Sequence, residues 1–471
     1  MNYITNDKKL NKGLKLFGVT VFWLLVWQVV AMAVSNTLLL PTVFETAGAL
    51  FALVKEASFY FDVAWTILRC VLSISISVGL GILLAFIAYK NKLLRSVMTL
   101  PVSFFKAVPV MAIVIYVILL VESDWVAVVA CFLMCFPVVY TNVLAGLDAV
   151  SKELLEVATV YRFSEAHKRK YIYLPSILPN INAAMKIVAG LSWKAVVAAE
   201  VLSVPEFSLG QGMINAKYYL ETPTLFAYIA VIVALSLCLE KVIIKLTEKF
   251  SQRRYEGSKF DWAKEYEVGL LKAPAIDIIG ISKSFEGKEV LRDITLSVDA
   301  GSKVAFAGPS GIGKTTLARI IAELEKPDSG DLMFSEDIKI SYLFQEDRML
   351  PWLNVYDNLT VSMISSGASP NNDSIVEMAK NLEIEDVLWS LPEELSGGMK
   401  HRVALGRTLL AHCNLLILDE PFRGLDEELK KRIVERLWDS CTDNKTVIVI
   451  THNQEDLELL EIEKSLSIHV E

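Results

Sequence analysis

The sequence predicts an all-α membrane domain with six spans, followed by an α/β domain. Three observations lead to this fold class. The first half of the chain contains apolar stretches long enough to cross a bilayer. The run Gly308-Pro309-Ser310-Gly311-Ile312-Gly313-Lys314-Thr315 is typical of a phosphate-binding loop between a strand and a helix. From Ile276 onward, short β-branched runs alternate with helical stretches, as they do in α/β domains.

Composition supports a membrane component. Of the 471 residues, 53% are hydrophobic, which is a high fraction for a soluble enzyme. The mean hydropathy of +0.44 indicates the same. The formal net charge of −8 gives no reason to expect nucleic acid as a partner. Cys131 and Cys135 share a helix face, and we interpret them as apolar core residues because the six cysteines show no metal-ligand spacing.

The apolar stretches and their basic flanks predict a topology. The predicted spans lie at about 16–38, 66–89, 98–121, 125–146, 180–204 and 224–247. Lys and Arg cluster before the first span and after the second, fourth and sixth. Because these residues concentrate on the cytoplasmic side, we expect the N-terminus and the α/β domain in the cytoplasm. The first apolar run lacks a convincing cleavage site and is interpreted as an uncleaved anchor.

Three parts are expected along the chain. Residues 1–250 form the membrane domain, with a cytoplasmic helix near 151–167. Residues 251–274 are polar and charged, which is typical of a linker. Residues 275–471 form the α/β domain.

The glycine-rich loop predicts how a nucleotide triphosphate is held. Its glycines leave backbone N–H groups free to point at phosphate oxygens. Lys314 is expected to reach the β- and γ-phosphates, and the Thr315 hydroxyl is expected to ligate Mg²⁺. The predicted phosphate-binding set is Gly308, Pro309, Ser310, Gly311, Gly313, Lys314, Thr315 and Thr316.

Two further motifs carry chemistry. The apolar run 415–418 ends in Asp419 and Glu420. Beside a phosphate-binding loop, Asp419 can hold Mg²⁺ through its water shell, and Glu420 can polarise the attacking water. A helix cap or surface turn is the alternative. Ser396-Gly397-Gly398 places a hydroxyl and two unhindered amides at a helix N-terminus, which is an anion site, although alone it is a common turn.

With these motifs in this order, the chain resembles the ATP-binding cassette family. The resemblance implies that Gln345 senses Mg²⁺ and the attacking water, and that Asp426 belongs to a second nucleotide-contacting loop. It also implies that His452 contacts the γ-phosphate and that Phe285 stacks on adenine. An exposed histidine at a helix start is the alternative for His452. His401 departs from the family pattern, because glutamine is usual there.

The family also implies partners. Two of its ATPase domains dimerise head to tail, and each ATP lies between the phosphate-binding loop of one and the Ser396, Gly397 and Gly398 segment of the other. Because this chain has one full set of motifs, the resemblance implies either a second copy of the chain or a different partner with its own set, with ATP and Mg²⁺ bound between the two.

The loop after the fourth span resembles the docking helix of type I importer permeases. Glu156 and Ala158 carry the resemblance, together with Leu174 and Pro175 after a basic stretch. An amphipathic helix here could offer its apolar face to the ATPase. Arg162 stands where a glycine is usual, so the geometry of the bend stays open. A plain cationic cytosolic loop is the alternative.

Other segments indicate which group within the family the chain resembles. Residues 40–45, 105–109 and 197–201 resemble permeases of the nitrate, sulfonate and taurine group, and residues 344–352 resemble their ATPases. This implies ATP-driven import of a small anion across the bacterial inner membrane, with an extracytoplasmic binding protein and membrane lipid as partners. The alternatives are import of a vitamin precursor of the thiamine-pathway pyrimidine or riboflavin type, an exporter half-transporter, and a membrane ATPase that transports nothing.

Charged residues inside spans are costly and usually face a cavity or a partner. Lys106, Lys194 and Glu200 are the candidates for the solute pathway. The alternative for the two lysines is a structural pair with Glu200. Arg69 and Lys186 lie near span ends, where long side chains are expected to reach toward the membrane surface.

Overall fold

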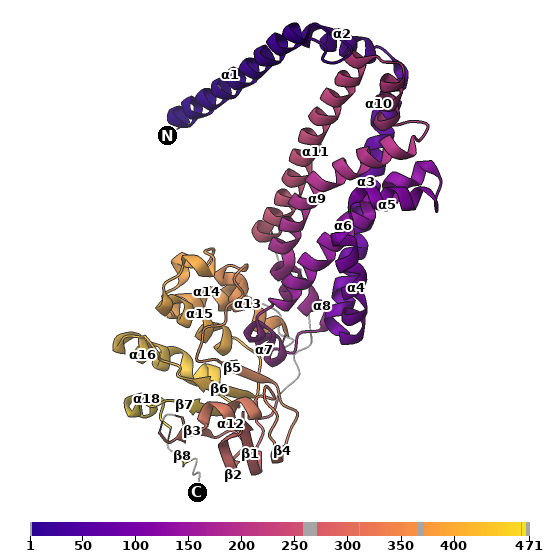
Figure 1. Ribbon diagram of the computed structural model, residues 1–471. Coiled ribbons are helices and arrows are strands. Elements are labelled where there is room, and N and C mark those ends of the chain that lie inside the picture. The colour runs from indigo at the N-terminus through magenta and orange to yellow at the C-terminus, as the bar shows by residue number, and fades with distance from the viewer. Residues whose placement is uncertain (1, 258–270, 310, 366–371, 463, 468–471) are drawn as a thin grey trace. The chain divides into compact units, whose positions relative to one another are not determined.

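The computed structural model describes residues 2–257, 271–309, 311–365, 372–462 and 464–467 (Figure 1). They form two compact units. One contains Met1–Ala149 and Ile177–Gln252, and the other contains Val150–Ser176 and Arg253–Glu471. The segment after the fourth predicted span therefore groups with the C-terminal unit. The domain boundaries at 250 and 274 stay predictions, and most of the expected linker lies outside the described residues.

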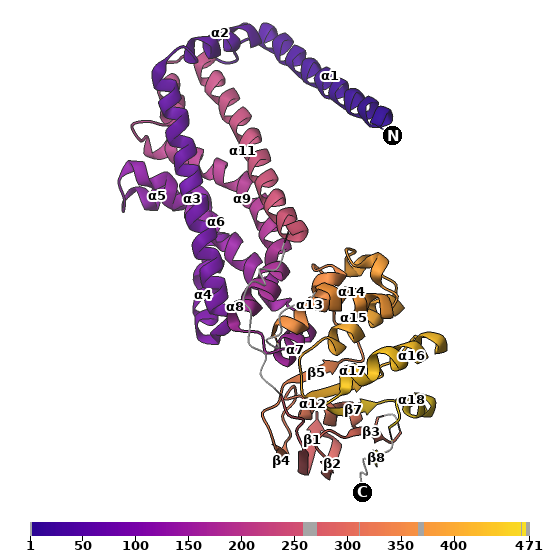
Figure 2. The ribbon, with the colours of Figure 1, turned by 180° about the vertical axis from the view of Figure 1, so that it is seen from behind.

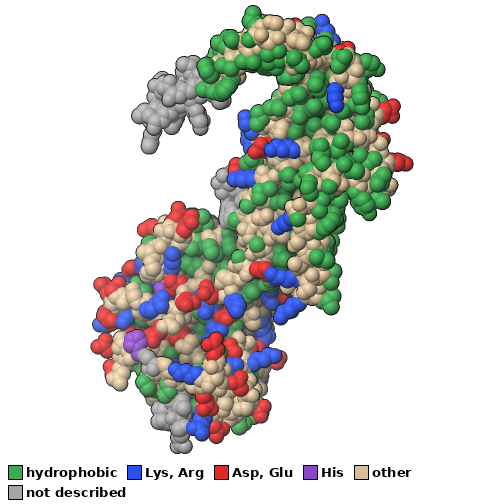
Figure 3. Space-filling view, viewed as in Figure 1, with side chains coloured by type: hydrophobic (Ala, Val, Ile, Leu, Met, Phe, Trp, Pro, Cys, Tyr) green, Lys and Arg blue, Asp and Glu red, His purple; other side chains and the backbone are tan. Residues whose placement is uncertain are grey.

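The first unit is helical, and its exposed surface in Figure 3 is mainly hydrophobic, as expected of a surface in contact with lipid. Its helices are α1 (Asn2–Val34), α2 (Val43–Leu53), α3 (Ala57–Lys90), α4 (Lys92–Ala107), α5 (Val110–Ile118), α6 (Ser123–Asp148), α9 (Leu174–Ser203), α10 (Leu209–Tyr218) and α11 (Thr222–Gly257).

Among the described helices, four are long and apolar enough to cross a membrane: Phe17–Val34, Ala57–Lys90, Ser123–Asp148 and Thr222–Lys249. The bent pair of α4 and α5 makes a fifth if it counts as one span. The predicted span at 180–204 coincides with α9 up to Ser203, and α9 is not among them. The chain is thus a multi-pass membrane protein, and the count of six stays a prediction.

The predicted third span, at 98–121, is not one continuous helix. α4 and α5 meet at a bend of 105°. Val108 between them is extended, with φ −75° and ψ 131°, and Pro109 is the N-cap of α5. Proline lacks an N–H group and disfavours the helical conformation of the residue before it, which accounts for the break.

A buried charge cluster joins the helices of the first unit. Arg69 on α3 is only 5% exposed, and it donates to Glu200 of α9 at 3.0 Å and to Asp124 of α6 at 2.8 Å. Glu200 also accepts from the Thr66 hydroxyl at 2.9 Å and from the Gly210 N–H at 3.4 Å. The expectation that Arg69 reaches toward the membrane surface is therefore wrong, because two carboxylates hold it inside the unit.

The described residues of the second unit form two sheets, whose strands can be followed in Figure 2. β2 (Lys288–Val298), β1 (Ile276–Phe285) and β4 (Ser329–Phe334) form an antiparallel sheet in that order. A parallel sheet has the order β5-β6-β7-β3-β8. Its strands are β3 (Lys303–Ala307), β5 (Ile340–Leu343), β6 (Leu415–Asp419), β7 (Thr446–Ile450) and β8 (Lys464–Ser467).

Helices cover the parallel sheet, and α14 and α15 lie on the side away from the antiparallel sheet (Figures 1 and 2). The helical elements of this unit are α7 (Lys152–Val160), α8 (Glu165–Lys168), η1 (Arg169–Tyr173), α12 (Lys314–Ile321), α13 (Val355–Ser365), α14 (Asn372–Asn381), η2 (Glu385–Val387), η3 (Pro392–Glu394), α15 (Gly397–Leu409), α16 (Glu427–Ile433), η4 (Val434–Trp438), α17 (Asp439–Thr442) and α18 (Gln454–Leu459).

Every residue of β5, β6 and β7 is buried. Strands covered on both faces need continuous apolar runs, and this explains why the sequence shows no alternation there. Because the strands are parallel, the loops that follow them leave from one edge of the sheet. The predicted catalytic residues come from those loops.

The buried charge cluster predicts a stability difference. Arg69→Met leaves the Glu200 carboxylate buried without its cationic partner, which typically costs about 3–5 kcal/mol. Arg95→Met is the matched control, because Arg95 pairs with Asp148 where both side chains are exposed (46% and 38%), and such pairs contribute about 0–1 kcal/mol. Thermal unfolding of the two purified variants in one detergent checks this; equal midpoints would contradict it.

Candidate active site

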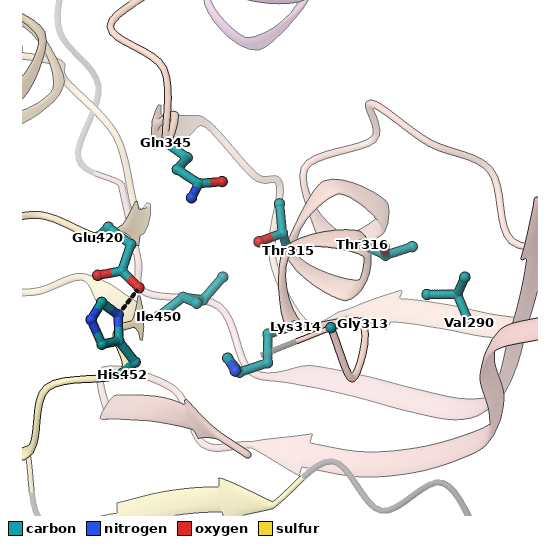
Figure 4. Close-up of a pocket in the computed structure, with 10 residues that line it drawn as sticks. Val290, Gly313, Lys314, Thr315, Thr316, Gln345, Glu420, Ile450 and His452 are labelled. Atoms are coloured by element: carbon teal, nitrogen blue, oxygen red, sulfur yellow. Dashed lines mark hydrogen bonds and ion pairs between the residues drawn. The ribbon is translucent and has the colours of Figure 1, made fainter. Parts of the chain in front are cut away.

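A cavity of about 260 Å³ lies at the carboxyl edge of the parallel sheet (Figure 4). The segments after β3, β5 and β6 line it, together with β2 and the end of β7. Residues far apart in the sequence therefore meet in one place. The lining residues are Val290, Gly311, Gly313, Lys314, Thr315, Thr316, Gln345, Glu420, Ile450 and His452.

The loop after β3 leads into α12, whose first residue is the buried Lys314. The Lys314 ammonium donates to the carbonyls of Gly308, at 2.6 Å, and Pro309, at 2.9 Å. Gly313 has φ +99°, and a Cβ there would lie 2.5 Å from Leu291 Cδ2, so only glycine fits. A helix N-terminus with free amides and an ammonium suits a phosphate. Ser310 of the predicted set lies outside the described residues.

Three of the predicted side chains suit a magnesium ion. The Thr315 hydroxyl donates to Asp419 Oδ2 at 2.9 Å, and Gln345 lines the same cavity. Burial raises the pKa of Asp419 to about 6, because the charged carboxylate loses contact with water, and a bound cation would offset this effect. These oxygen donors are the type Mg²⁺ prefers. No group of three His, Cys, Asp or Glu side chains in the described part of the chain could hold a metal, so nucleotide phosphates are expected to supply further ligands.

Glu420 and His452 form the charged pair of the cavity. Glu420 Oε1 lies 2.8 Å from His452 Nδ1. A dashed line marks this contact in Figure 4. Hydrogen bonding to Glu420 raises the pKa of His452, so the pair is present at lower pH and is lost as the pH rises through that pKa. Glu420 adopts the left-handed conformation, with φ +55°, and such strain in a non-glycine residue is concentrated at functional sites. This carboxylate is placed to act as a general base on a water in the cavity.

Outside the phosphate-binding loop, five predicted nucleotide contacts do not line this cavity. The Ser396 hydroxyl caps α15 by accepting from the Met399 N–H at 3.3 Å, and the Asp426 carboxylate caps α16 in the same way. Phe285 lies at the end of β1 and is exposed. The roles of these residues stay predictions, as do those of the two glycines at the start of α15. The five are Phe285, Ser396, Gly397, Gly398 and Asp426.

The predicted docking helix is α7, and it packs within the same unit as the parallel sheet. Ala158 is fully buried, and Leu154 packs with it in an apolar cluster with Leu350 and Leu353. Apolar contacts therefore hold α7 to the segment of Leu350 and Leu353, which is far from α7 in the sequence. The predicted pair Leu174 and Pro175 begins α9 and is half-buried.

Glu156 of α7 is held by two arginines. The guanidinium of Arg319 donates to it at 2.7 and 2.9 Å, and Arg348 donates to it as well. Burial raises the pKa of Glu156, but the two guanidinium groups outweigh this effect and the net pKa is lowered. The pairs are therefore ionised at neutral pH. Arg319 belongs to α12, which begins with Lys314, so Glu156 is joined directly to the phosphate-binding helix.

The bend after α7 keeps the geometry that a glycine would favour. Arg162 has φ +49°. The Phe163 N–H donates to the Ala158 carbonyl at 2.8 Å, and the Arg162 N–H donates to the Thr159 carbonyl at 3.0 Å. These two bonds form the usual helix end with a left-handed residue. Arginine at this position therefore strains the bend without removing it.

The candidate solute residues are not paired with one another. The Lys106 ammonium donates to the Thr141 hydroxyl at 3.1 Å. Lys194 is exposed and forms no hydrogen bond or ion pair within the part of the chain that the structure describes. Glu200 is buried with Arg69, so neither lysine forms the alternative pair with it, and its carboxylate is not presented to a solute in this conformation.

Several residues that shape the site could not be found from motifs. Val290 and Ile450 line the cavity, and only the strand register places them there. Arg319 and Arg348 hold Glu156 from 163 and 192 residues away in the sequence. Neither an arginine in a helix, such as Arg319, nor one in a loop, such as Arg348, carries a spacing signal for such a partner, so sequence motifs alone did not indicate these pairs.

Comparisons with known proteins found a matching family model for each half of the chain. A family model described as "ABC transporter" matches residues 291–423. Another, described as "Binding-protein-dependent transport system inner membrane component", matches residues 77–243.

Two curated proteins illustrate the similarity. The aliphatic sulfonates import ATP-binding protein SsuB of Delftia acidovorans is 38% identical over 197 residues, which is 40% of this chain and 77% of that protein. The sulfate/thiosulfate import ATP-binding protein CysA of Pseudomonas aeruginosa is 36% identical over 200 residues, 39% of this chain and 60% of that protein. A solved dimeric ATP-binding cassette in a post-hydrolysis state is 25% identical, with a TM-score of 0.37, and covers 41% of this chain and 94% of its own.

Glu420→Gln is expected to lower ATP turnover by about 10²–10⁴-fold, because the amide cannot accept the proton of the attacking water. ATP binding should persist, since the variant leaves the phosphate-binding loop intact. Glu428→Gln is the matched control, because that carboxylate is 90% exposed in the same unit. Phosphate release and nucleotide binding by the purified full chain are the measurements. Turnover by Glu420→Gln close to that of the control would remove Glu420 from the chemistry.

Proposed function

Because the chain belongs to the ABC transporter family and joins a binding-protein-dependent permease region to an ATPase, we propose that it imports a small anion across the bacterial inner membrane. ATP hydrolysis by the C-terminal unit drives this transport. The observation that carries the proposal is the occurrence of both matched regions in one chain. Such importers receive solute from a separate extracytoplasmic binding protein, which is the partner we propose here.

The relatives support an anion as solute. Their names refer to aliphatic sulfonates and to sulfate or thiosulfate. Two ammonium groups within the predicted spans, those of Lys106 and Lys194, are exposed and are not neutralised by any carboxylate that the structure describes. Cationic groups inside a membrane commonly mark a pathway for negatively charged solutes. We propose these two lysines, and not Glu200, as the solute contacts.

A second candidate solute is an aromatic vitamin precursor. A cavity of about 410 Å³ in the helical unit is lined by Trp65, Trp125 and Phe207. Among the described residues that line it, the one basic side chain is that of Arg69, which is already paired with Glu200 and Asp124. Stacking surfaces with carboxylates beside them suit a planar solute with N–H groups better than an anion.

We propose that two copies of the chain form the working unit. The Ser396 hydroxyl and the amides of Gly397 and Gly398 stand at the N-terminus of α15, where an anion would be favoured. However, this segment is not among the described residues that line the Lys314 cavity of the same copy. In the proposed dimer, the second copy supplies the segment to the nucleotide.

The proposed mechanism assigns a task to each side chain of the cavity. Lys314 and the amides of its loop hold the β- and γ-phosphates, which orients the terminal phosphate for attack. Glu420 accepts a proton from the attacking water, and His452 holds the Glu420 carboxylate in place. Bound Mg²⁺ would neutralise charge on the phosphates, with Thr315, Gln345 and Asp419 as its protein partners.

We propose α7 as the element that links ATP hydrolysis to the permease. The Glu156 carboxylate joins Arg319, on the helix of Lys314, and Arg348, three residues after Gln345. A movement of the helix of Lys314, or of the segment that follows Gln345, is therefore transmitted to α7 through these ion pairs. We further propose six spans and a cytoplasmic N-terminus, together with a membrane domain over 1–250, a linker over 251–274 and the ATPase over 275–471.

Uptake by vesicles tests the function. The purified chain is reconstituted with ATP on the side of the ATPase, and a labelled sulfonate, sulfate or thiamine-pathway pyrimidine is placed on the other side with a binding protein encoded nearby. ATP-dependent uptake that requires the binding protein, and that Glu420→Gln abolishes, is expected. Transport without any binding protein would indicate an exporter, and ATP turnover without movement of any solute would indicate a non-transporting ATPase.

Reversing one charge on α7 tests the proposed link. Glu156→Arg replaces two ion pairs by repulsion, and losing charged hydrogen bonds of about 1.5–3 kcal/mol corresponds to roughly tenfold or more in rate. Transport should fall more than ATP turnover does, and adding Arg319→Glu should restore part of it. Glu153→Arg is the matched control, because Glu153 is exposed on the same helix. Equal loss in both single variants would argue against the proposed link.

A further inference from the structure

His452 depends on its backbone for its position in the cavity. Its side chain is 74% exposed and points toward Glu420 in Figure 4. An exposed ring has few packing contacts that could fix it. Its place is therefore set by the turn that carries it, which consists of Thr451, His452 and Asn453 and joins β7 to α18.

Both neighbours of His452 are tied to Asp456, in the first turn of α18. The Thr451 hydroxyl donates to Asp456 Oδ2 at 3.5 Å, and the Asn453 side-chain amide donates to Asp456 Oδ1 at 3.4 Å. The Asn453 N–H also donates to the Thr451 hydroxyl at 3.1 Å. Thr451 and Asp456 are both buried. One buried carboxylate therefore accepts hydrogen bonds from both sides of the histidine.

A buried lysine of α16 holds this carboxylate in turn. The Lys430 ammonium donates to Asp456 Oδ1 at 3.1 Å, and Lys430 is only 7% exposed. It also donates to Glu427 at 2.7 Å, but that carboxylate is exposed. Desolvation offsets most of the attraction within a buried ion pair, so the pair with Asp456 contributes little net stability. What the ammonium does fix is the orientation of the Asp456 carboxylate.

We propose that Lys430 is a positioning residue for His452. By holding the Asp456 carboxylate in one orientation, its ammonium keeps the oxygens turned toward the residues on either side of the histidine. The turn then presents the imidazole to Glu420, 2.8 Å away. Lys430 is not among the described residues that line the cavity, so it acts through the turn alone. This inference rests on the proposed role of His452 in ATP hydrolysis.

Removing the ammonium should slow hydrolysis without weakening ATP binding. Lys430→Met is expected to lower kcat about tenfold, the cost of one hydrogen bond to a charged group. KM for ATP should change little, because the phosphate-binding loop is intact. Lys430→Arg keeps a cation that can donate to Asp456 and should keep most of the turnover. Lys431→Met is the matched control, because Lys431 is exposed on the same helix. The measurements use the purified full chain, below the unfolding midpoint of every variant.

Exchanging the two charges separates positioning from stability. Lys430→Glu combined with Asp456→Lys restores an ion pair between α16 and α18, so the midpoint of thermal unfolding should recover relative to either single variant. An ammonium at position 456 cannot accept a hydrogen bond from Thr451 or Asn453. Therefore kcat should stay about tenfold below that of the unaltered chain. Recovery of kcat together with stability would show that the pair only joins two helices, and would overturn the proposal.

Thr451 provides a second test that leaves the ion pair intact. Thr451→Val removes the hydroxyl with almost no change of shape and should also lower kcat about tenfold, whereas Thr451→Ser keeps the hydroxyl and should keep the turnover.

His452→Ala distinguishes a failure of this inference from a failure of the proposed function. Full turnover in that variant would remove the role of His452 and this inference with it. If His452→Ala loses turnover while folded Lys430→Met and Thr451→Val match the Lys431→Met control, only the positioning role of Lys430 is wrong.

Discussion

The chemistry of this protein depends on the parallel register of its buried strands. β6 pairs with β5 and β7, and β7 pairs with β3, all in parallel. Their carboxyl ends therefore meet at one edge. A slip of one residue would turn the side chains of a strand to its other face, and the close packing of side chains of different shape on both faces resists this. The register brings together Lys314, Gln345, Glu420 and His452, which lie in four separate parts of the sequence.

Features with a local cause could be predicted from the sequence. Glycine spacing identified the loop before Lys314, and long apolar runs identified most of the spans. Features that depend on a distant partner could not. Arg69 was expected near the membrane surface, but Glu200, 131 residues away, holds it inside. Pro109 was visible in the sequence, yet a proline inside a span is compatible with a kinked helix, and packing decides whether the helix breaks.

Apolar contacts and ion pairs have different roles at α7. Apolar side chains such as Leu154 and Ala158 hold the helix in the unit. The ion pairs of Glu156 also fix the orientation of α7, because a bidentate contact with a guanidinium determines orientation as well as distance. Half-buried ion pairs contribute little net stability, since desolvation offsets most of their attraction. Their value here lies in fixing α7 relative to the helix of Lys314.

Support for the strained Glu420 comes from both sides of its backbone. Its N–H donates to the Ile450 carbonyl at 2.8 Å, and the carbonyl of the next residue, Pro421, faces His401 at 3.0 Å. Since His401 lies little more than one turn from the N-terminus of α15, that end of the helix has two tasks. In the proposed dimer, its first residues contact the nucleotide of the second copy, while the ring of His401 contacts the carbonyl of the residue that follows Glu420 in its own chain.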